Sequence, residues 1–245
     1  MSIAASNGSI WPNVEASGAG SRKAGELSSS RKAFAFATMC LGCFLASSDL
    51  LILVVSIQEI GGGLAASQVE LSWVMTSYLT MEGAVIPLAA WLARVLSTGG
   101  LLSMSAAGFA ITSLLCSMAW DIRSMIVFRA IQGLFGGSMI PVTQTAAVAL
   151  FKGKRSAVVA VTIVAAIVGL AATVGPLLSG WIEYNWSWRG LFFVNVVFGG
   201  VLAILAPILV RIDEADLSLL KRADYPRIVL MVTCLVRLNY VLQEG

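Results

Sequence analysis

Long apolar stretches separated by short polar connections run along most of this chain. Residues 1–30 are rich in Ser, Gly and Ala, and seven apolar stretches follow them. The stretches lie at residues 33–57, 71–93, 100–119, 124–150, 156–182, 190–210 and 228–243. A helix needs about 20 mainly apolar residues to cross a bilayer, and the first six stretches reach that length. The seventh is shorter and carries Arg237, which makes it a weaker candidate for a complete span.

This pattern predicts an all-α integral membrane protein with six transmembrane helices and a partial seventh. We expect a disordered tail over residues 1–32, because its composition offers few groups for a packed core. The tail also lacks the apolar core of a signal peptide. The six-helix bundle is expected at 33–210, a solvated linker at 211–227, and the start of a truncated central helix at 228–245.

Composition supports a membrane protein and disfavours an enzyme. The chain is 58% hydrophobic and 12% charged, whereas soluble domains contain about 25% charged residues. It has no histidine, so carboxylates must carry any proton traffic. Cys40 and Cys43 have CxxC spacing, but without a second ligand pair we interpret them as small packing residues rather than metal ligands. No nucleophile–base pair is recognisable, and neither a bound cofactor nor a nucleic-acid partner is expected.

The basic residues predict an orientation. Cytoplasmic loops of membrane proteins carry an excess of Lys and Arg. With the N-terminus in the cytoplasm, twelve of the sixteen basic residues fall on the cytoplasmic side, and only Arg123 and Arg189 fall on the outer side. The linker that contains Asp213 lies on the cytoplasmic side in this arrangement. Aromatic residues near the outer ends of the spans, among them Trp73 and Tyr78, are expected to anchor the protein at the interface.

Three charged residues lie inside the first six predicted spans. Arg129 interrupts the fourth stretch, and an arginine at the bilayer centre costs roughly 2.5–3.5 kcal/mol on insertion scales. From the helical rise, Asp49 lies about 24 Å from the inner face and Arg129 about 8 Å below the outer face, so the two can meet. Glu82 lies near the middle of the second stretch. We interpret Asp49 and Glu82 as candidate proton carriers with Arg129 as the partner of Asp49, and a static salt bridge is the alternative.

Small residues on the fourth and fifth stretches predict close helix packing. Such residues let neighbouring backbones approach one another, and a proline in a helix removes one hydrogen bond and allows a bend. The residues concerned are Gly133, Gly136 and Gly137 on the fourth stretch, and Gly169, Gly175, Pro176 and Gly180 on the fifth.

The order of several short motifs resembles the drug:proton antiporters of the major facilitator superfamily, specifically the EmrB-like branch of the EmrB/QacA family. The resemblance extends from about residue 33 to the end. The motifs are Arg129-Ala-Ile-Gln132-Gly133, similar to RxxQG; Gly175-Pro176-Leu-Leu-Ser179-Gly180, similar to GPxxGG; Trp188 to Val196, similar to WxxxFxxN; and Ser72 to Tyr78 with Ile86 to Ala93 on the second helix.

The resemblance implies a proton-driven exporter of hydrophobic, often cationic drugs, which uses the proton gradient and no cofactor. Asp49 occupies the position of the family's first-helix acid, which implies that it couples proton movement to drug. Arg129 and Gln132 occupy motif positions. The resemblance also implies a multi-pass protein of a bacterial inner membrane that works with a periplasmic adaptor and an outer-membrane channel.

The sequence departs from the family pattern at several positions. The loop after the second helix, residues 90–99, carries one base and no acid where a Gly-Asp-Arg-rich motif is usual. Glu82 stands at a usually neutral position, and Ala171 and Ser179 replace glycines. The resemblance covers one six-helix half, whereas alternating access requires two bundles. The alternative is therefore a truncated membrane protein that does not transport, either inert or acting by association with a partner. A facilitator of polar solutes is a weaker alternative.

Overall fold

The six predicted membrane helices are present. The structure, a computed structural model, describes residues 28–151, 153–221 and 225–244 of the 245-residue chain. The helices are α2 (Ser29–Leu64), α3 (Gln68–Leu96), α4 (Thr98–Ser117), α5 (Ile122–Gly136), α6 (Met139–Leu150), α7 (Lys154–Asn185), α8 (Trp188–Leu209), α9 (Ser218–Lys221) and α10 (Tyr225–Glu244). Six segments are long and apolar enough to span a membrane, with α5 and α6 together forming the fourth. Residues 1–27 of the predicted disordered tail lie outside the described residues.

The fourth span differs from the continuous helix that the sequence predicts. It is interrupted between Gly136 and Met139. Gly136, Gly137 and Ser138 are consecutive weak helix formers, and Pro141 has no N–H to donate to the carbonyl of Gly137. The chain therefore turns between α5 and α6 at the level where it passes α3.

Polar side chains fix where several helices begin. The Ser28 side chain accepts a hydrogen bond from the Arg31 N–H, so α2 begins at Ser29 rather than at residue 33. Ser67 and Glu70 form a reciprocal capping box at the start of α3, and Asp121 and Ser124 form one at the start of α5.

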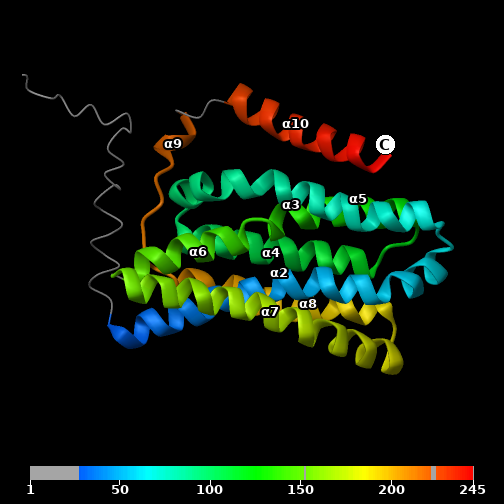
Figure 1. The fold of residues 1–245 in the computed structure, drawn as a ribbon, viewed down its shortest axis with the longest axis horizontal. Coiled ribbons are helices and arrows are strands. Elements are labelled where there is room, and N and C mark those ends of the chain that lie inside the picture. Colours follow the sequence, from blue (N-terminus) through cyan, green and yellow to red (C-terminus); the bar gives the residue numbers. More distant parts are fainter. Residues whose placement is uncertain (1–27, 152, 222–224, 245) are drawn as a thin grey trace, which may run out of the picture.

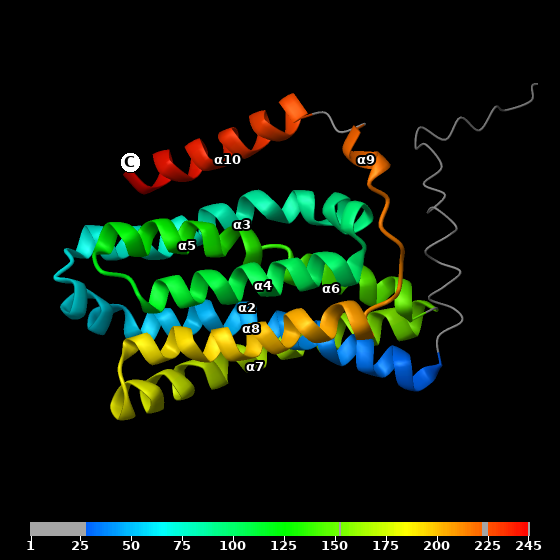
Figure 2. The same ribbon diagram turned by 180° about the vertical axis from the view of Figure 1, so that it is seen from behind.

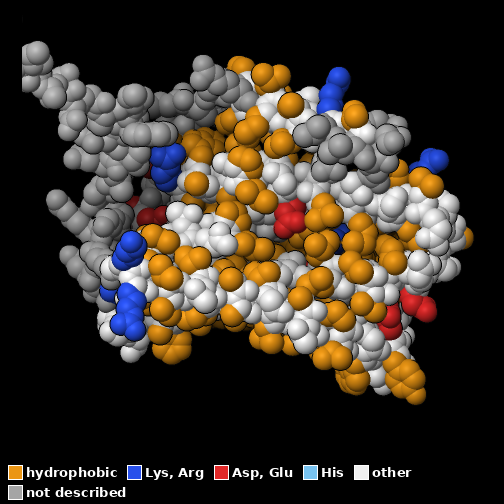
Figure 3. Space-filling view, viewed as in Figure 1, with side chains coloured by type: hydrophobic (Ala, Val, Ile, Leu, Met, Phe, Trp, Pro, Cys, Tyr) orange, Lys and Arg blue, Asp and Glu red, His pale blue; other side chains and the backbone are white. Residues whose placement is uncertain are grey.

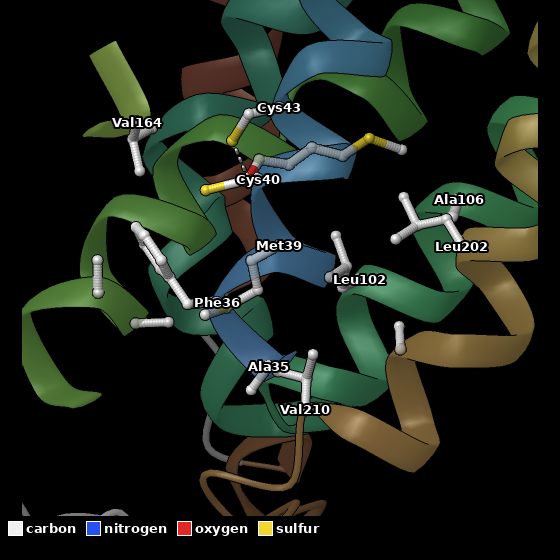
Figure 4. Close-up of a cluster of buried hydrophobic side chains, with 14 of the residues drawn as sticks. Ala35, Phe36, Met39, Cys40, Cys43, Leu102, Ala106, Val164, Leu202 and Val210 are labelled. Atoms are coloured by element: carbon white, nitrogen blue, oxygen red, sulfur yellow. Dashed lines mark hydrogen bonds between the residues drawn. The ribbon is translucent and has the colours of Figure 1, made fainter. Parts of the chain in front are cut away.

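The helices form one bundle around α2. Helix α2 contacts α6, α7 and α8, while α4 packs between α5 and α8, and α3 packs on α5. Both ribbon views place α3 and α5 towards α10 and place α7 on the far side of the bundle (Figures 1 and 2). Apolar side chains of α2, α4 and α8 fill the centre, as the cluster with Phe36, Met39, Leu102 and Leu202 shows (Figure 4).

The linker is not simply solvated. Ile212 is buried, and the carboxylate of Asp213 accepts hydrogen bonds from the Thr98 N–H at 2.8 Å and from its hydroxyl at 2.9 Å. The linker thereby caps the start of α4. Helix α10 contacts α3, but its apolar part, Ile228–Arg237, is too short for a complete span, in agreement with the weaker seventh stretch.

Candidate functional site

A buried polar network ties four helices together near the middle of the bundle. Arg129 on α5 donates from one terminal nitrogen to Asp49 Oδ2 on α2 at 2.6 Å. The same nitrogen donates to Gln132 Oε1 at 2.7 Å. Asn195 on α8 donates to Asp49 Oδ1 at 2.5 Å, and the Gln132 amide donates to Ser113 on α4 at 2.7 Å and to Asp49 Oδ1 at 3.4 Å. The structure therefore joins Asp49 to Arg129, the partner that the sequence analysis suggested for it, and adds Gln132 from the same motif as Arg129.

The side chains of this network are buried. Arg129 and Gln132 are 0% exposed, and Asp49 and Asn195 are 2% exposed. In such a low-dielectric setting, a charge requires a partner, and each hydrogen bond to an ion is stronger than a neutral one. Asp49 accepts from three donors on two helices other than its own, so its ionised form holds α2 to α5 and α8.

Tyr78 completes the surroundings of Arg129. The guanidinium carbon lies 4.2 Å from the centroid of the Tyr78 ring, within the range of a cation–π interaction. Tyr78 is 0% exposed, which corrects the prediction that this residue anchors the protein at the membrane interface. Its ring faces α5 because α3 and α5 approach closely at this level.

Glycines of α5 make that approach possible. A Cβ at Gly133 would lie 2.3 Å from the carbonyl oxygen of Tyr78, and one at Gly137 would lie 2.6 Å from that of Glu82. At Gly136, a Cβ would lie 2.6 Å from the Tyr78 hydroxyl oxygen. Real Cβ atoms do not approach so closely. Gly133 and Gly137, which face backbone atoms, therefore require glycine while the helices keep this spacing, and a side chain at Gly136 would displace the Tyr78 hydroxyl.

Glu82 lies beside the network without joining its hydrogen bonds among the described residues. It sits on α3 with its backbone against Gly137 and its side chain partly exposed. It is close enough to Asp49 and Arg129 to interact with both electrostatically. Glu82 is thus a separate acid, one turn along α3 from Tyr78.

The fifth span makes a different contact with α2. Gly175 packs against Leu51, and Pro176 lies within α7. Ser179 shares a 2.5 Å hydrogen bond with Ser56, and both are buried. Where the family pattern has glycine, this chain therefore has a hydroxyl that links α7 to α2. Gly180 and Gly169 have no neighbour within 4 Å of a Cβ position in the described structure and so make no tight contact there.

Asn195, Ser113 and Tyr78 were not selected as site residues from the sequence. Asn195 appeared only within a motif, although a polar amide in the strongly apolar α8 is itself an indication of a buried partner. Cys40 and Cys43 are free and buried among core side chains, and Cys43 donates weakly to the Met139 carbonyl. Among the described residues, no group of three His, Cys, Asp or Glu side chains is arranged to hold a metal ion.

Comparison with known proteins identifies the family of this chain. The sequence profile of the Major Facilitator Superfamily matches residues 37–236. The chain is 39% identical over 211 residues to the colistin resistance protein EmrB of Acinetobacter baumannii, covering 86% of this chain and 41% of that protein. It is 32% identical to the fatty acid resistance protein FarB of Neisseria gonorrhoeae, covering 87% of this chain and 42% of that one. Identity to the multidrug export protein EmrB of Escherichia coli K12 is 31%, covering 84% and 40%.

The chain thus spans about two fifths of the length of these relatives. A solved structure with a similar fold is that of a bacterial homolog of the human lysosomal transporter Spinster, in an inward-facing, unoccupied conformation. It superposes with a TM-score of 0.58 at 17% identity, covering 77% of this chain and 44% of that one.

Proposed function

The chain belongs to the major facilitator superfamily, a family of multi-pass membrane transporters, and on this premise we propose that its six helices form the first bundle of a proton-driven exporter of hydrophobic compounds. Supporting this proposal, three relatives are named for colistin resistance, fatty acid resistance and multidrug export. The substrates we propose are hydrophobic drugs, including cations.

The observation that carries the proposal is the Asp49 network. As a carboxylate, Asp49 accepts hydrogen bonds from Arg129, Gln132 and Asn195. A proton on either carboxylate oxygen of Asp49 turns that oxygen from a hydrogen-bond acceptor into a donor. It also removes the negative charge that pairs with Arg129. Protonation of Asp49 therefore loosens α2 from α5 and α8, and deprotonation fastens them again. This is the kind of two-state element that links proton binding to helix movement.

Glu82 is the second acid in this proposal. It lies within electrostatic reach of both Asp49 and Arg129 and is only partly buried. Intramembrane acids commonly relay protons, so we assign Glu82 the exchange of protons between Asp49 and the more exposed face of α3.

We place the protein in a bacterial inner membrane with its N-terminus and linker in the cytoplasm. The distribution of Lys and Arg supports this orientation. Surrounding lipid, a periplasmic adaptor and an outer-membrane channel are the partners we propose, together with the second bundle that alternating access requires.

The test is proton-dependent efflux after replacement of Asp49. In everted membrane vesicles from cells that express the chain from its own locus, energised transport of a fluorescent hydrophobic cation is compared for wild type, Asp49→Asn and Asp121→Asn. We expect Asp49→Asn to abolish transport that depends on the proton gradient, because the amide cannot be deprotonated. Asp121 caps α5 outside the spans, so Asp121→Asn should retain transport.

Undiminished gradient-dependent efflux by Asp49→Asn, at equal membrane abundance, would contradict the coupling role. If wild type itself shows no efflux, the alternative of a membrane protein that does not transport replaces the proposal. Immunoblotting for the mass of the native polypeptide accompanies the assay, because a band near the calculated 25.8 kDa would require a separate second bundle.

A further inference from the structure

An apolar groove of about 870 Å³ runs between the first halves of α2 and α7. At one end the two helices are joined by the Ser56–Ser179 hydrogen bond. The groove lies at the other end, where the helices are farther apart. Small side chains such as Ala33 and Ala37 leave it open along α2. Its larger apolar lining residues include Phe36, Leu41, Phe44, Phe151, Ile163 and Ile167.

The groove runs along α2 and α7 for a length comparable to the depth of one lipid leaflet. Lining residues run from Ser29 to Phe44 on α2 and from Arg155 to Ile167 on α7. At the helical rise these distances are about 22 Å and about 18 Å. Half of a hydrocarbon core measures about 15 Å, so the groove matches the length of an acyl chain that enters from the surface.

Positive charge gathers at the mouth of the groove. Arg155 lines it and is exposed, and Lys154 precedes it in the first turn of α7. Arg31 and Lys32 lie in the first turn of α2. Figure 3 shows Lys and Arg side chains at the end of the molecule where α7 begins. No Asp or Glu is among the described residues that line the groove.

We propose that this groove is a binding site for an anionic phospholipid, with the headgroup at Arg155 and an acyl chain along Phe36 and Phe44. The apolar walls match the chain, and the cations at one end match a negative headgroup. The site is separate from the Asp49 network, and it requires only that the bundle spans a membrane. A bound lipid would hold α2 and α7 at the spacing that the structure shows.

Native mass spectrometry of the full chain in a mild detergent tests this site. The protein is titrated with an equimolar mixture of phosphatidylglycerol and phosphatidylcholine of the same acyl chains, and with palmitate in a separate series. We expect phosphatidylglycerol to bind in preference. Arg155→Gln should weaken its binding about fivefold, the effect of losing one basic residue near a charged lipid surface. Arg211→Gln removes an exposed arginine at the same end outside the groove and should leave binding unchanged.

Ala37→Trp distinguishes the groove from the charge alone. Ala37 is exposed, so the substitution leaves the core intact, and its ring should block the acyl chain and reduce binding of both phospholipids. Equal losses for Arg155→Gln and Arg211→Gln would overturn the proposal. Binding of palmitate without binding of phosphatidylglycerol would also overturn it, because the groove would then be a free fatty acid site. Lipid binding that appears only after removal of residues 1–27 would overturn it too, because that segment would then be the occupant of the groove.

Discussion

Arg129 and Asp49 form a buried ion pair. Removing two ions from water costs several kcal/mol each, and their mutual attraction offsets this only with good geometry and further hydrogen bonds. Here Asn195 donates a second hydrogen bond to Asp49, Gln132 accepts one from Arg129, and the Tyr78 ring covers the guanidinium. Arg129 Nε and Nη2 have no hydrogen-bond partner among the described residues. We therefore expect stability to depend strongly on the loss of either charge alone and much less on the loss of both together.

We expect this asymmetry to be measurable. Arg129→Leu should destabilise the protein by roughly 3–5 kcal/mol, because it leaves the Asp49 carboxylate buried without its cation. Adding Asp49→Asn in the same chain should restore most of the stability, since the amide carries no charge, but should not restore proton-dependent efflux. Thermal unfolding in detergent for the wild type, both single variants and the double variant gives the coupling energy. Additive effects of the two substitutions would contradict a direct pair.

At the scale of elements, contacts between backbones set the position of the site. Gly133 and Gly137 allow α5 to lie against the carbonyl groups of α3, and this approach carries Tyr78 onto Arg129. The turn between α5 and α6 follows at once, so Gly137 serves both the contact with α3 and the interruption of the span.

Substitution of glycines should separate the effect of helix packing on stability from the effect of helix propensity. Gly133→Ala is expected to destabilise the bundle by about 1–3 kcal/mol, because the added methyl meets the α3 backbone and forces the helices apart. Gly169→Ala, on the open face of α7, should be neutral or slightly stabilising, since alanine favours helix and meets no neighbour. Thermal unfolding of the two variants checks this, and similar losses at both positions would refute the contact.

The contact between Asp213 of the linker and Thr98 predicts how stability changes with pH. Partial burial raises the pKa of Asp213, although its hydrogen bonds from Thr98 act in the opposite direction. Asp213 is then harder to ionise in the folded chain than in the unfolded chain. Its contribution to the free energy of unfolding is therefore fully present below the pKa that it has in the unfolded chain. It is lost as the pH rises through the raised folded pKa. We expect Asp213→Asn to flatten that decline in the melting temperature between acidic and neutral pH.

Asp121 is expected to change stability with pH in the opposite direction. Hydrogen bonds from Ser124 lower the pKa of Asp121, so its contribution is present above the unfolded pKa and is lost as the pH falls. Asp121→Asn should therefore flatten the acidic limb of the stability profile. Equal pH profiles for wild type and both variants would show that neither carboxyl differs between the folded and unfolded states.

At the scale of the whole molecule, the arrangement of side chains is that of a protein surrounded by lipid. Large apolar side chains are exposed along the length of α7 and α8, and most Lys and Arg side chains lie near the ends of the helices (Figure 3). Such an extensive apolar surface requires lipid or another protein against it.

Orientation is tested by labelling single cysteines from one side of the membrane. In a variant with the four native cysteines replaced, Tyr184→Cys near the end of α7 and Ala215→Cys in the linker are both at exposed positions. With the N-terminus in the cytoplasm, a membrane-impermeant maleimide should label Tyr184→Cys in cells with a permeabilised outer membrane and should label Ala215→Cys only after lysis. The reverse pattern would invert the topology.

The sequence by itself determined the six spans, their order and the residues most costly to bury. Length and hydropathy decide a membrane helix locally, because the lipid interior leaves the backbone no partner outside its own helix. The predicted stretch 190–210 lies within two residues of Trp188–Leu209, whereas the stretch 33–57 begins four residues after the start of Ser29–Leu64 and ends seven residues before its end. Asp49, Arg129 and Glu82 were recognisable because charges are rare in such segments.

Only the tertiary structure decided which of these residues meet. Helical rise placed Asp49 and Arg129 at similar depths, but depth does not specify which helices are neighbours or which way each one faces. Packing of α2, α5 and α8 brought Asn195 to Asp49, and the glycine contact brought Tyr78 from its expected interfacial place to the Arg129 guanidinium. The same packing left Glu82 beside the network rather than in it. These outcomes depend on the rotation of each helix about its axis, which contacts between distant segments fix.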